Sequence, residues 1–311
     1  MSLSIGTNDS DMRASQAASI AARGMEASME RLSTGKRINS ASDDAAGVAI
    51  SSRLSAEVRG TNQSVRNALD AQALLDTAEG SHKEIENVLQ RMREIAVQSA
   101  NDTNNTQDRL NLQTEMNSMI KEIDRIAHAT TWAGQNLLDG DANGDPDTNA
   151  AFSFQVGSAT GTQNQISVNI GSTTAESLGL THTDGNSLAI VIADATATAN
   201  GRTATEHVTG NAATTAAGNA MVTIGVIDAA IEEVNTQRST LGATANRLNH
   251  TVNNLTNISA NLSSAQGRIQ DADFAIETTN LAKNQILQQA STAMLAQANA
   301  SQANVLGLLR S

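Results

Sequence analysis

Apolar residues recur in alternating steps of three and four along most of this chain, a spacing that predicts long helices packed through one narrow face. The spacing keeps its phase through Gly80, so a single helix about 80 Å long is expected over residues 45–99. Shorter seams of the same kind occupy 18–32, 112–126 and 224–255. The sequence therefore predicts a mainly α protein, an elongated and coiled-coil-like helix bundle.

Aromatic residues and proline are scarce enough to support this prediction. The chain of 311 residues has three Phe, one Trp and no Tyr. An enzyme core of this size would normally contain more rings, because each ring buries a large area. Aliphatic residues must therefore fill the core, which suits narrow helix seams, and the single proline, Pro146, leaves nearly all of the chain free to be helical.

Charge and cysteine usage exclude several classes of function. The formal net charge of -12 argues against nucleic acid as a partner, because binding phosphates requires clustered Lys and Arg. The absence of cysteine removes disulfides and thiolate metal sites. Residues 1–11 lack the pattern of a Sec signal peptide, and no apolar stretch approaches the roughly 20 residues of a membrane span. We expect a chain that does not enter a membrane, or that leaves the cell by another route.

The middle of the chain departs from the helical pattern. Residues 134–150 are rich in Gly, Asp and Asn, and apolar residues then alternate in a way that predicts a β-hairpin over 151–170. Residues 181–218 drift to Thr, Ala, Gly and Asn, with one convincing apolar run at 188–192, which predicts a short variable surface insertion. Because long helices lie on both sides of this region, we expect the two terminal segments to pair with each other.

The terminal segments 12–32 and 281–309 carry few charges on the faces outside their seams. Two interpretations are open: these helices pack only on each other, or neighbouring copies bury them as well. The first seam is predicted to run through Ala18, Ala22, Met25, Met29 and Leu32. The apolar residues expected to take part in self-assembly are Met25, Met29, Leu32, Leu281, Leu287, Met294, Val305 and Leu308.

Side chains that could carry chemistry have simple structural interpretations. Asp43 and Asp44 precede a predicted helix, so helix capping is favoured over a catalytic acid pair. The methionines occupy seam positions, which indicates core filling and not metal or redox chemistry. The histidines lack HExxH spacing or an evident Ser or Asp partner, so no catalytic or zinc site is predicted; they are His82, His128, His182, His207 and His250.

One acidic loop has partial calcium-binding spacing. Residues 139–147 follow the D-x-D-x-N-G pattern, with Gly144 at the sharp turn. Position twelve, however, is Ala150 in place of a bidentate Glu, and a predicted strand follows where a helix is usual. A solvated acidic turn and a Ca²⁺ site are both compatible with this loop, whose ligands would be Asp139, Asp141, Asn143, Asp145 and Asp147.

Several long stretches together resemble the bacterial flagellin family. At the N-terminal side they are "MERLSTGKRINSASDDAAGVAISSRL" (29–54) and "LQRMREIAVQSANDT" (89–103). At the C-terminal side they are "LGATANRLNHTVNNL" (241–255), "RIQDADFAIETTNLAKNQILQQASTAMLAQAN" (268–299) and "NVLGLLR" (304–310). They occur in the family's order and at its distances from the ends, so the resemblance is specific.

This resemblance implies a subunit that polymerises into the flagellar filament for swimming motility, with no cofactor and no enzymatic activity. Its inner terminal-helix domain would comprise 1–45 and 268–311, unordered until assembly. The helical rod domain would comprise 46–180 and 219–267, and the surface insertion 181–218. A related protein of the hook–filament junction is the alternative, and an enzyme on the same scaffold would need a motif such as HExxH in the insertion, which has none.

The resemblance also implies partners. These are other copies of the chain, an export chaperone, the filament cap and junction proteins, and a host Toll-like receptor. Export by the flagellar type III apparatus would place the protein outside the cell. For the receptor, Arg91 would be the central cation, Ile95 the apolar contact and Glu115 the acidic contact. Arg91 and Ile95 lie four residues apart, so they share a helix face, and both are expected to be exposed beside the seam.

Overall fold

The computed structural model describes residues 8–140, 150–181, 198–199, 202–203 and 216–310. The chain divides into two compact units, one made of Met1–Arg59 with Ile258–Ser311 and the other of Gly60–Asn257. Two helices, α2 (Ala45–Ala100) and α4 (Ala216–Gln270), contribute residues to both units. Among the described residues, no helix is both long and apolar enough to cross a membrane.

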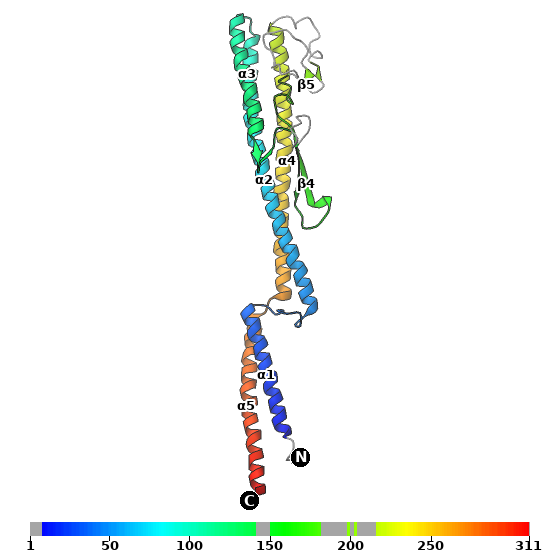
Figure 1. Cartoon of the computed structure of the whole chain (residues 1–311), viewed down its shortest axis with the longest axis vertical. Helices are drawn as coiled ribbons and strands as arrows, with labels where there is room; N and C mark the ends of the chain where they lie inside the picture. The colour runs from blue at the N-terminus through cyan, green and yellow to red at the C-terminus, as the bar shows by residue number, and fades with distance from the viewer. Residues whose placement is uncertain (1–7, 141–149, 182–197, 200–201, 204–215, 311) are drawn as a thin grey trace. The chain divides into compact units, whose positions relative to one another are not determined.

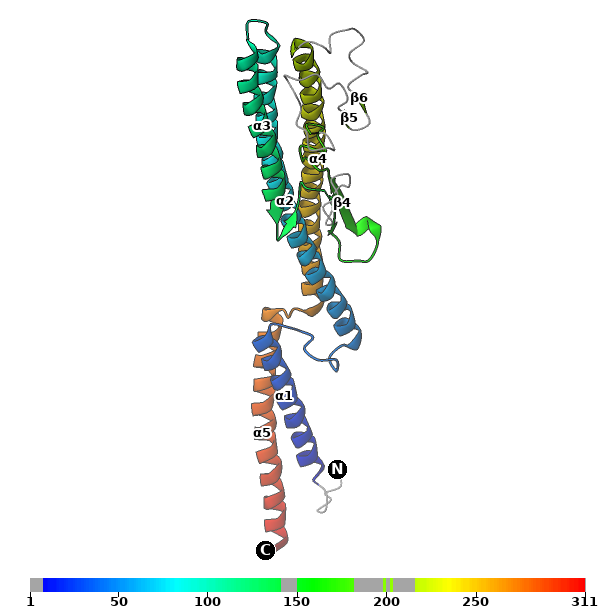
Figure 2. The same ribbon diagram turned by 45° about the horizontal axis from the view of Figure 1, so that its top comes forward.

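The terminal unit is built on two helices, α1 (Asp9–Thr34) and α5 (Phe274–Arg310). They lie side by side and antiparallel, with the start of α1 and the end of α5 at the same end of the pair (Figure 1; Figure 2). A Cβ atom added to Gly24 would lie 2.7 Å from the side chain of Asn284, so the two backbones approach closely. The most buried positions hold mainly small residues; they are Ala14, Ala21, Ser28, Glu277, Ser291 and Ala298. The predicted pairing of the terminal segments is confirmed.

A short linker joins α1 to α2 and is fixed to the junction between α4 and α5. Gly35 ends α1 in the left-handed conformation, with φ of 69°, which glycine adopts without steric cost. The backbone N–H of Arg37 donates to the carbonyl of Gln270 at 2.7 Å, and that of Ala272 donates to the carbonyl of Gly35 at 2.9 Å. These two hydrogen bonds hold the α1–α2 linker against the junction between α4 and α5.

Of the acidic pair in this linker, Asp44 caps a helix as the sequence predicts, whereas Asp43 stabilises the turn before it. The Asp44 carboxylate accepts a hydrogen bond from the backbone N–H of Gly47 at 2.9 Å, at the start of α2. The Asp43 carboxylate accepts from the backbone N–H groups of Asn39 and Ser40 at 3.0 and 2.9 Å. Hydrogen bonds from Ser40 and Asn39 hold the pKa of Asp43 below its usual value.

The second unit contains α3 (Thr106–Ala129) beside α2 and α4 (Figure 1). Residues 101–105 separate α2 from α3, and a capping box begins α3. In that box the backbone N–H of Asp108 donates to Asn105 Oδ1 at 2.8 Å, and the Asn105 N–H donates to the Asp108 carboxylate at 3.1 Å. The predicted seams are confirmed as core; their buried residues include Leu75, Ile85, Leu89, Met92, Met116, Ile123, Ile227, Val234 and Leu241.

A hairpin and two very short ribbons supply the strands. Strands β3 (Ala150–Gln155) and β4 (Gln165–Ile170) pair antiparallel, with Phe152 opposite Val168, which confirms the predicted hairpin. Val156, Ile166 and Ile170 belong to the core formed with the helices, so the hairpin is held by apolar packing.

The remaining strands are two residues long. They are β1 (Thr131–Trp132) with β2 (Gln135–Asn136), and β5 (Thr198–Ala199) with β6 (Arg202–Thr203) in the predicted insertion. A 3-10 turn, η1 (Thr162–Asn164), precedes β4. The predicted apolar run at 188–192 lies outside the described residues.

Candidate assembly surface

Large apolar side chains of the terminal unit point away from the contact between its two helices. On α5, Met294 is 68% exposed and Leu287 is 45% exposed. The full set on α1 and α5 is Met12, Ile20, Met29, Phe274, Ile276, Ile286, Leu287 and Met294. Exposed apolar patches on a soluble protein mark sites of interaction, so this surface is the candidate functional site.

Heptad geometry explains why these residues are exposed. The more buried positions of α5 alternate in steps of four and three; they are Glu277, Leu281, Asn284, Gln288, Ser291, Leu295 and Ala298. Leu287 and Met294, seven residues apart, form a separate stripe beside that seam, and Ile286 adjoins it. Five of these seven seam positions hold small or polar residues, while the exposed apolar residues Leu287 and Met294 lie on another face.

The sequence-predicted assembly residues fall into three groups. Met29, Leu287 and Met294 are exposed, whereas Met25, Leu32 and Leu281 are half-buried at the edge of the helix contact. Val305 and Leu308 lie within α5, but their side chains are outside the described residues.

The prediction that Met29 lies in the α1 seam is wrong, because the seam passes through Ser28. Small residues at Ala14, Ala21 and Ser28 allow the close approach of α1 and α5, and a methionine in that stripe would hold the backbones apart. Met29 is consequently 49% exposed.

An ion pair that sequence reasoning missed lies at one end of the seam. Arg31 Nη1 donates to Glu277 Oε1 at 3.0 Å, and Glu277 is only 6% exposed. Burial acts to raise the pKa of Glu277, but hydrogen bonds from Arg31, Ser28 and Asn280 outweigh it and lower the pKa below its usual value. A buried carboxylate paired in this way favours one register between α1 and α5. The signal in the sequence was a charged residue at a heptad position.

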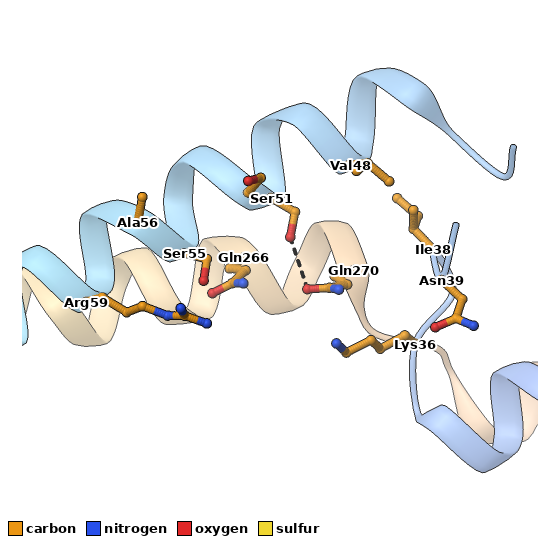
Figure 3. Close-up of a pocket in the computed structure, with 11 residues that line it drawn as sticks. Lys36, Ile38, Asn39, Val48, Ser51, Ser55, Ala56, Arg59, Gln266 and Gln270 are labelled. Carbon is orange, nitrogen blue, oxygen red and sulfur yellow. Dashed lines mark hydrogen bonds between the residues drawn. The ribbon is translucent and has the colours of Figure 1, made fainter. Parts of the chain in front are cut away.

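A polar pocket of about 620 Å³ lies in the same unit, lined by the linker, the start of α2 and the end of α4 (Figure 3). Ser51 Oγ donates to Gln270 Oε1 at 3.0 Å across it. Lys36 and Arg59 line it, and neither pairs with a carboxylate among the residues that the structure describes. The described lining offers hydroxyls, amides and these two cations, without a His or a carboxylate to act as a general base.

The residues expected to bind a receptor lie in the helical unit. Arg91 is half-exposed and donates to Glu94 at 2.8 Å and to Glu115 at 3.1 Å. These two hydrogen bonds, first that of Glu94, raise the pKa of Arg91. The expectation that Ile95 is exposed is wrong, since it is 1% exposed. Because α2 packs in a core with both α3 and α4, its buried face is wider than one seam and includes Ile95.

The acidic loop is described only at its beginning. Asp139 Oδ1 lies 2.9 Å from His128 Nδ1, and Asp139 Oδ2 accepts from Asn136 Nδ2 at 3.1 Å. Asp141, Asn143, Asp145 and Asp147 lie outside the described residues, so Ca²⁺ binding there stays a prediction.

Antiparallel helices that meet largely through small residues and expose large apolar side chains are typical of one class of protein, the structural subunits of larger assemblies. The comparisons identify the family. Residues 5–143 match the bacterial flagellin N-terminal helical region, and residues 224–309 match the C-terminal helical region. The chain belongs to the bacterial flagellin family and is a structural subunit of the flagellar filament.

Relatives similar along most of their length support this identification. Flagellin of Bacillus subtilis is 43% identical, with 91% of each chain covered. The flagellar filament 30.7 kDa core protein of Treponema maltophilum is 35% identical, with 98% of this chain and 99% of that protein covered. A solved structure from Vibrio parahaemolyticus, described as flagellar hook-associated, has a TM-score of 0.54 at 16% identity over 74% of this chain and 100% of its own. That likeness shows the fold alone.

Proposed function

We propose that the terminal unit forms the inner part of the filament, and that neighbouring copies bury the exposed apolar residues of α1 and α5. The inner domain would comprise 1–45 and 268–311, the rod domain 46–180 and 219–267, and the insertion 181–218 would remain on the filament surface. The observation that carries this proposal is the position of Leu287, Met294 and their apolar neighbours outside the α1–α5 seam.

Energetics support the interpretation in which neighbouring copies bury the terminal helices. Burial of one large aliphatic or methionine side chain is worth roughly 1.5–3 kcal/mol. The α1–α5 contact alone leaves Met12, Ile20, Ile286 and Met294 more than half exposed, and Leu287 45% exposed. A helical polymer gains this energy from each subunit that it adds, because identical neighbours cover the same surface repeatedly.

A charge on this surface should block assembly without unfolding the chain. We expect Leu287→Asp to raise the critical concentration for polymerisation at least about 100-fold, because burying an unpaired carboxylate costs on the order of 3 kcal/mol or more. The measurement is sedimentation of seeded filaments over a range of protein concentrations.

The matched control is Leu287→Met, which keeps the side chain apolar and should polymerise like the parent. Normal polymerisation of Leu287→Asp would show that neighbouring copies do not bury this stripe, and the proposal would then be wrong.

The exposed stripe also bears on the partners expected before assembly. We infer that an export chaperone covers apolar residues of the free subunit, that the flagellar type III apparatus secretes it, and that the filament cap and junction proteins contact it outside the cell. The support is the resemblance to flagellins together with the apolar surface that a free subunit exposes.

Recognition by a host Toll-like receptor is a separate proposal, supported by the exposure of Arg91 and Glu115. Ile95 is not part of it, because its side chain is buried. Arg91→Ala should weaken binding of the monomer to the receptor ectodomain about thirtyfold, equivalent to roughly 2 kcal/mol, since an arginine at the centre of an interface is commonly a hot spot. Titration of monomeric protein with the ectodomain, with folding checked by circular dichroism, measures the affinity.

Arg125→Ala provides the control, because Arg125 is also exposed and also pairs with a glutamate three residues away on its helix, Glu122. It should leave the affinity unchanged. Equal affinities for Arg91→Ala and the parent would show that Arg91 does not bind the receptor. It would then form only an ordinary surface ion pair, which is worth under about 1 kcal/mol.

A further inference from the structure

The methionines of this chain differ sharply in exposure. Met12, Met221 and Met294 are 64%, 65% and 68% exposed, whereas Met92 and Met116 are fully buried. A thioether reacts with oxygen-transfer oxidants when the oxidant reaches the sulfur, so exposure sets the order of reaction. The first three should therefore react well before the last two.

Two of the exposed methionines lie at the same level of the terminal helix pair. In an antiparallel helix pair, the numbers of two residues at the same level have a constant sum. Arg31 pairs with Glu277, and Gly24 lies against Asn284, so that sum is 308. The same register sets Ala14 level with Met294. Met12 is two residues before Ala14, about 3 Å further along the axis. Met12 and Met294 therefore lie at nearly the same level of the helix pair, near the start of α1, with Met12 on the side of α1 that faces away from α5.

Oxidation at these positions should not disturb the fold. Neither Met12 nor Met294 lies in the α1–α5 seam, whose buried positions are Ala14, Ser291 and their heptad partners. The surface that Met294 occupies with Leu287 is the one assigned above to neighbouring subunits. A more polar side chain at Met294 would weaken the contacts between subunits and leave the fold of each subunit unchanged.

We propose that Met294 and Met12 are oxidation sites, and that hydrogen peroxide reacting at them switches off self-assembly of the free subunit; the inference rests on the function proposed above. With peroxide, the thioether sulfur attacks one peroxide oxygen, an S–O bond forms and the O–O bond breaks. The sulfur loses two electrons and becomes a sulfoxide, and the other oxygen leaves as water after proton transfer.

The sulfoxide is polar and accepts hydrogen bonds, so burying it in an apolar contact is unfavourable. Neighbouring copies that cover Met294 also shield its sulfur from oxidant. Assembled subunits are consequently protected, and oxidised free subunits are excluded from growing filaments. Because methionine sulfoxide can be reduced enzymatically, the exclusion is reversible.

The experiment treats full-length monomer with hydrogen peroxide, locates oxidised residues by peptide mass spectrometry and measures the critical concentration by sedimentation. We expect Met12 and Met294 to oxidise while Met92 and Met116 stay reduced, with the critical concentration rising about tenfold. Methionine sulfoxide reductase should restore the original value. A Met12→Leu/Met29→Leu/Met294→Leu triple variant, which also removes the 49% exposed thioether of Met29, should polymerise like the parent and keep doing so after peroxide.

Met221→Leu is the matched control, since Met221 is equally exposed but lies in the helical unit, and this variant should stay sensitive to peroxide. Normal polymerisation of the oxidised parent, or sensitivity of the triple Leu variant, would overturn the inference. The Leu287→Asp variant separates the two proposals. If it fails to polymerise while oxidised parent succeeds, only the oxidation inference is wrong; if both polymerise, the assembly surface is wrong as well.

Discussion

A chain that lacks residues 285–311, or residues 1–30, is expected to form no filaments and to remain a folded, soluble monomer. The first deletion removes Leu287 and Met294 from the exposed apolar stripe, together with most of α5. The second removes most of α1, which leaves α5 without the partner for its seam. Electron microscopy of protein seeded with filament fragments, together with sedimentation, measures the loss.

Folding of the remainder is the control for both deletions. The buried cluster that includes Leu89, Met116 and Ile227 lies within 60–257, so it does not depend on the terminal helices. Circular dichroism should therefore show a cooperative thermal transition in both truncated chains. Normal filament growth from either one would contradict the role given to the terminal unit.

The second large effect concerns pH and the buried histidine of α2. His82 lies on the predicted seam and is fully buried, and this burial lowers its pKa from 6.5 to about 4. Gln237 partly offsets this shift, whereas the positive charge of Arg238 adds to it. Near His82, two carboxylates of α2, Glu79 and Glu86, pair with Arg238 of α4.

Because the pKa is lowered in the folded state, the unfolded chain binds the proton more readily between pH 6.5 and 4. Stability is therefore complete above about pH 6.5 and falls as the pH drops toward 4, by about 3 kcal/mol in total at 1.36 kcal/mol per pH unit. Urea unfolding followed by circular dichroism at pH 7 and at pH 4 measures this difference.

His82→Leu should remove most of that pH dependence. His250→Leu is the control, since His250 is exposed on α4, and it should keep the parent's pH dependence. An equally steep loss of stability toward pH 4 in the His82→Leu chain would show that His82 is not the cause.

The features that the sequence alone predicted correctly depend on interactions between residues close together in the chain. Helix ends follow from side chains that satisfy free backbone N–H groups nearby, as Asn105 and Asp108 do for α3 and Asp44 does for α2. The hairpin follows from alternating apolar residues, and the family from long matched stretches near both ends. The residues that decide these features lie close together in the chain or within one contiguous motif.

Only the tertiary structure decided which stripe of each helix is buried. A 3-4 pattern with apolar residues at adjacent positions permits more than one seam, and on α1 the choice of Ser28 over Met29 depends on how closely α5 approaches. Ile95 is buried because α2 packs in a core with two other helices, and Glu277 is buried because Arg31 pairs with it across 246 residues of sequence. Spacing along one segment carries no information about the size, number or charge of the partners that pack against it, so these positions were set by contacts distant in the chain.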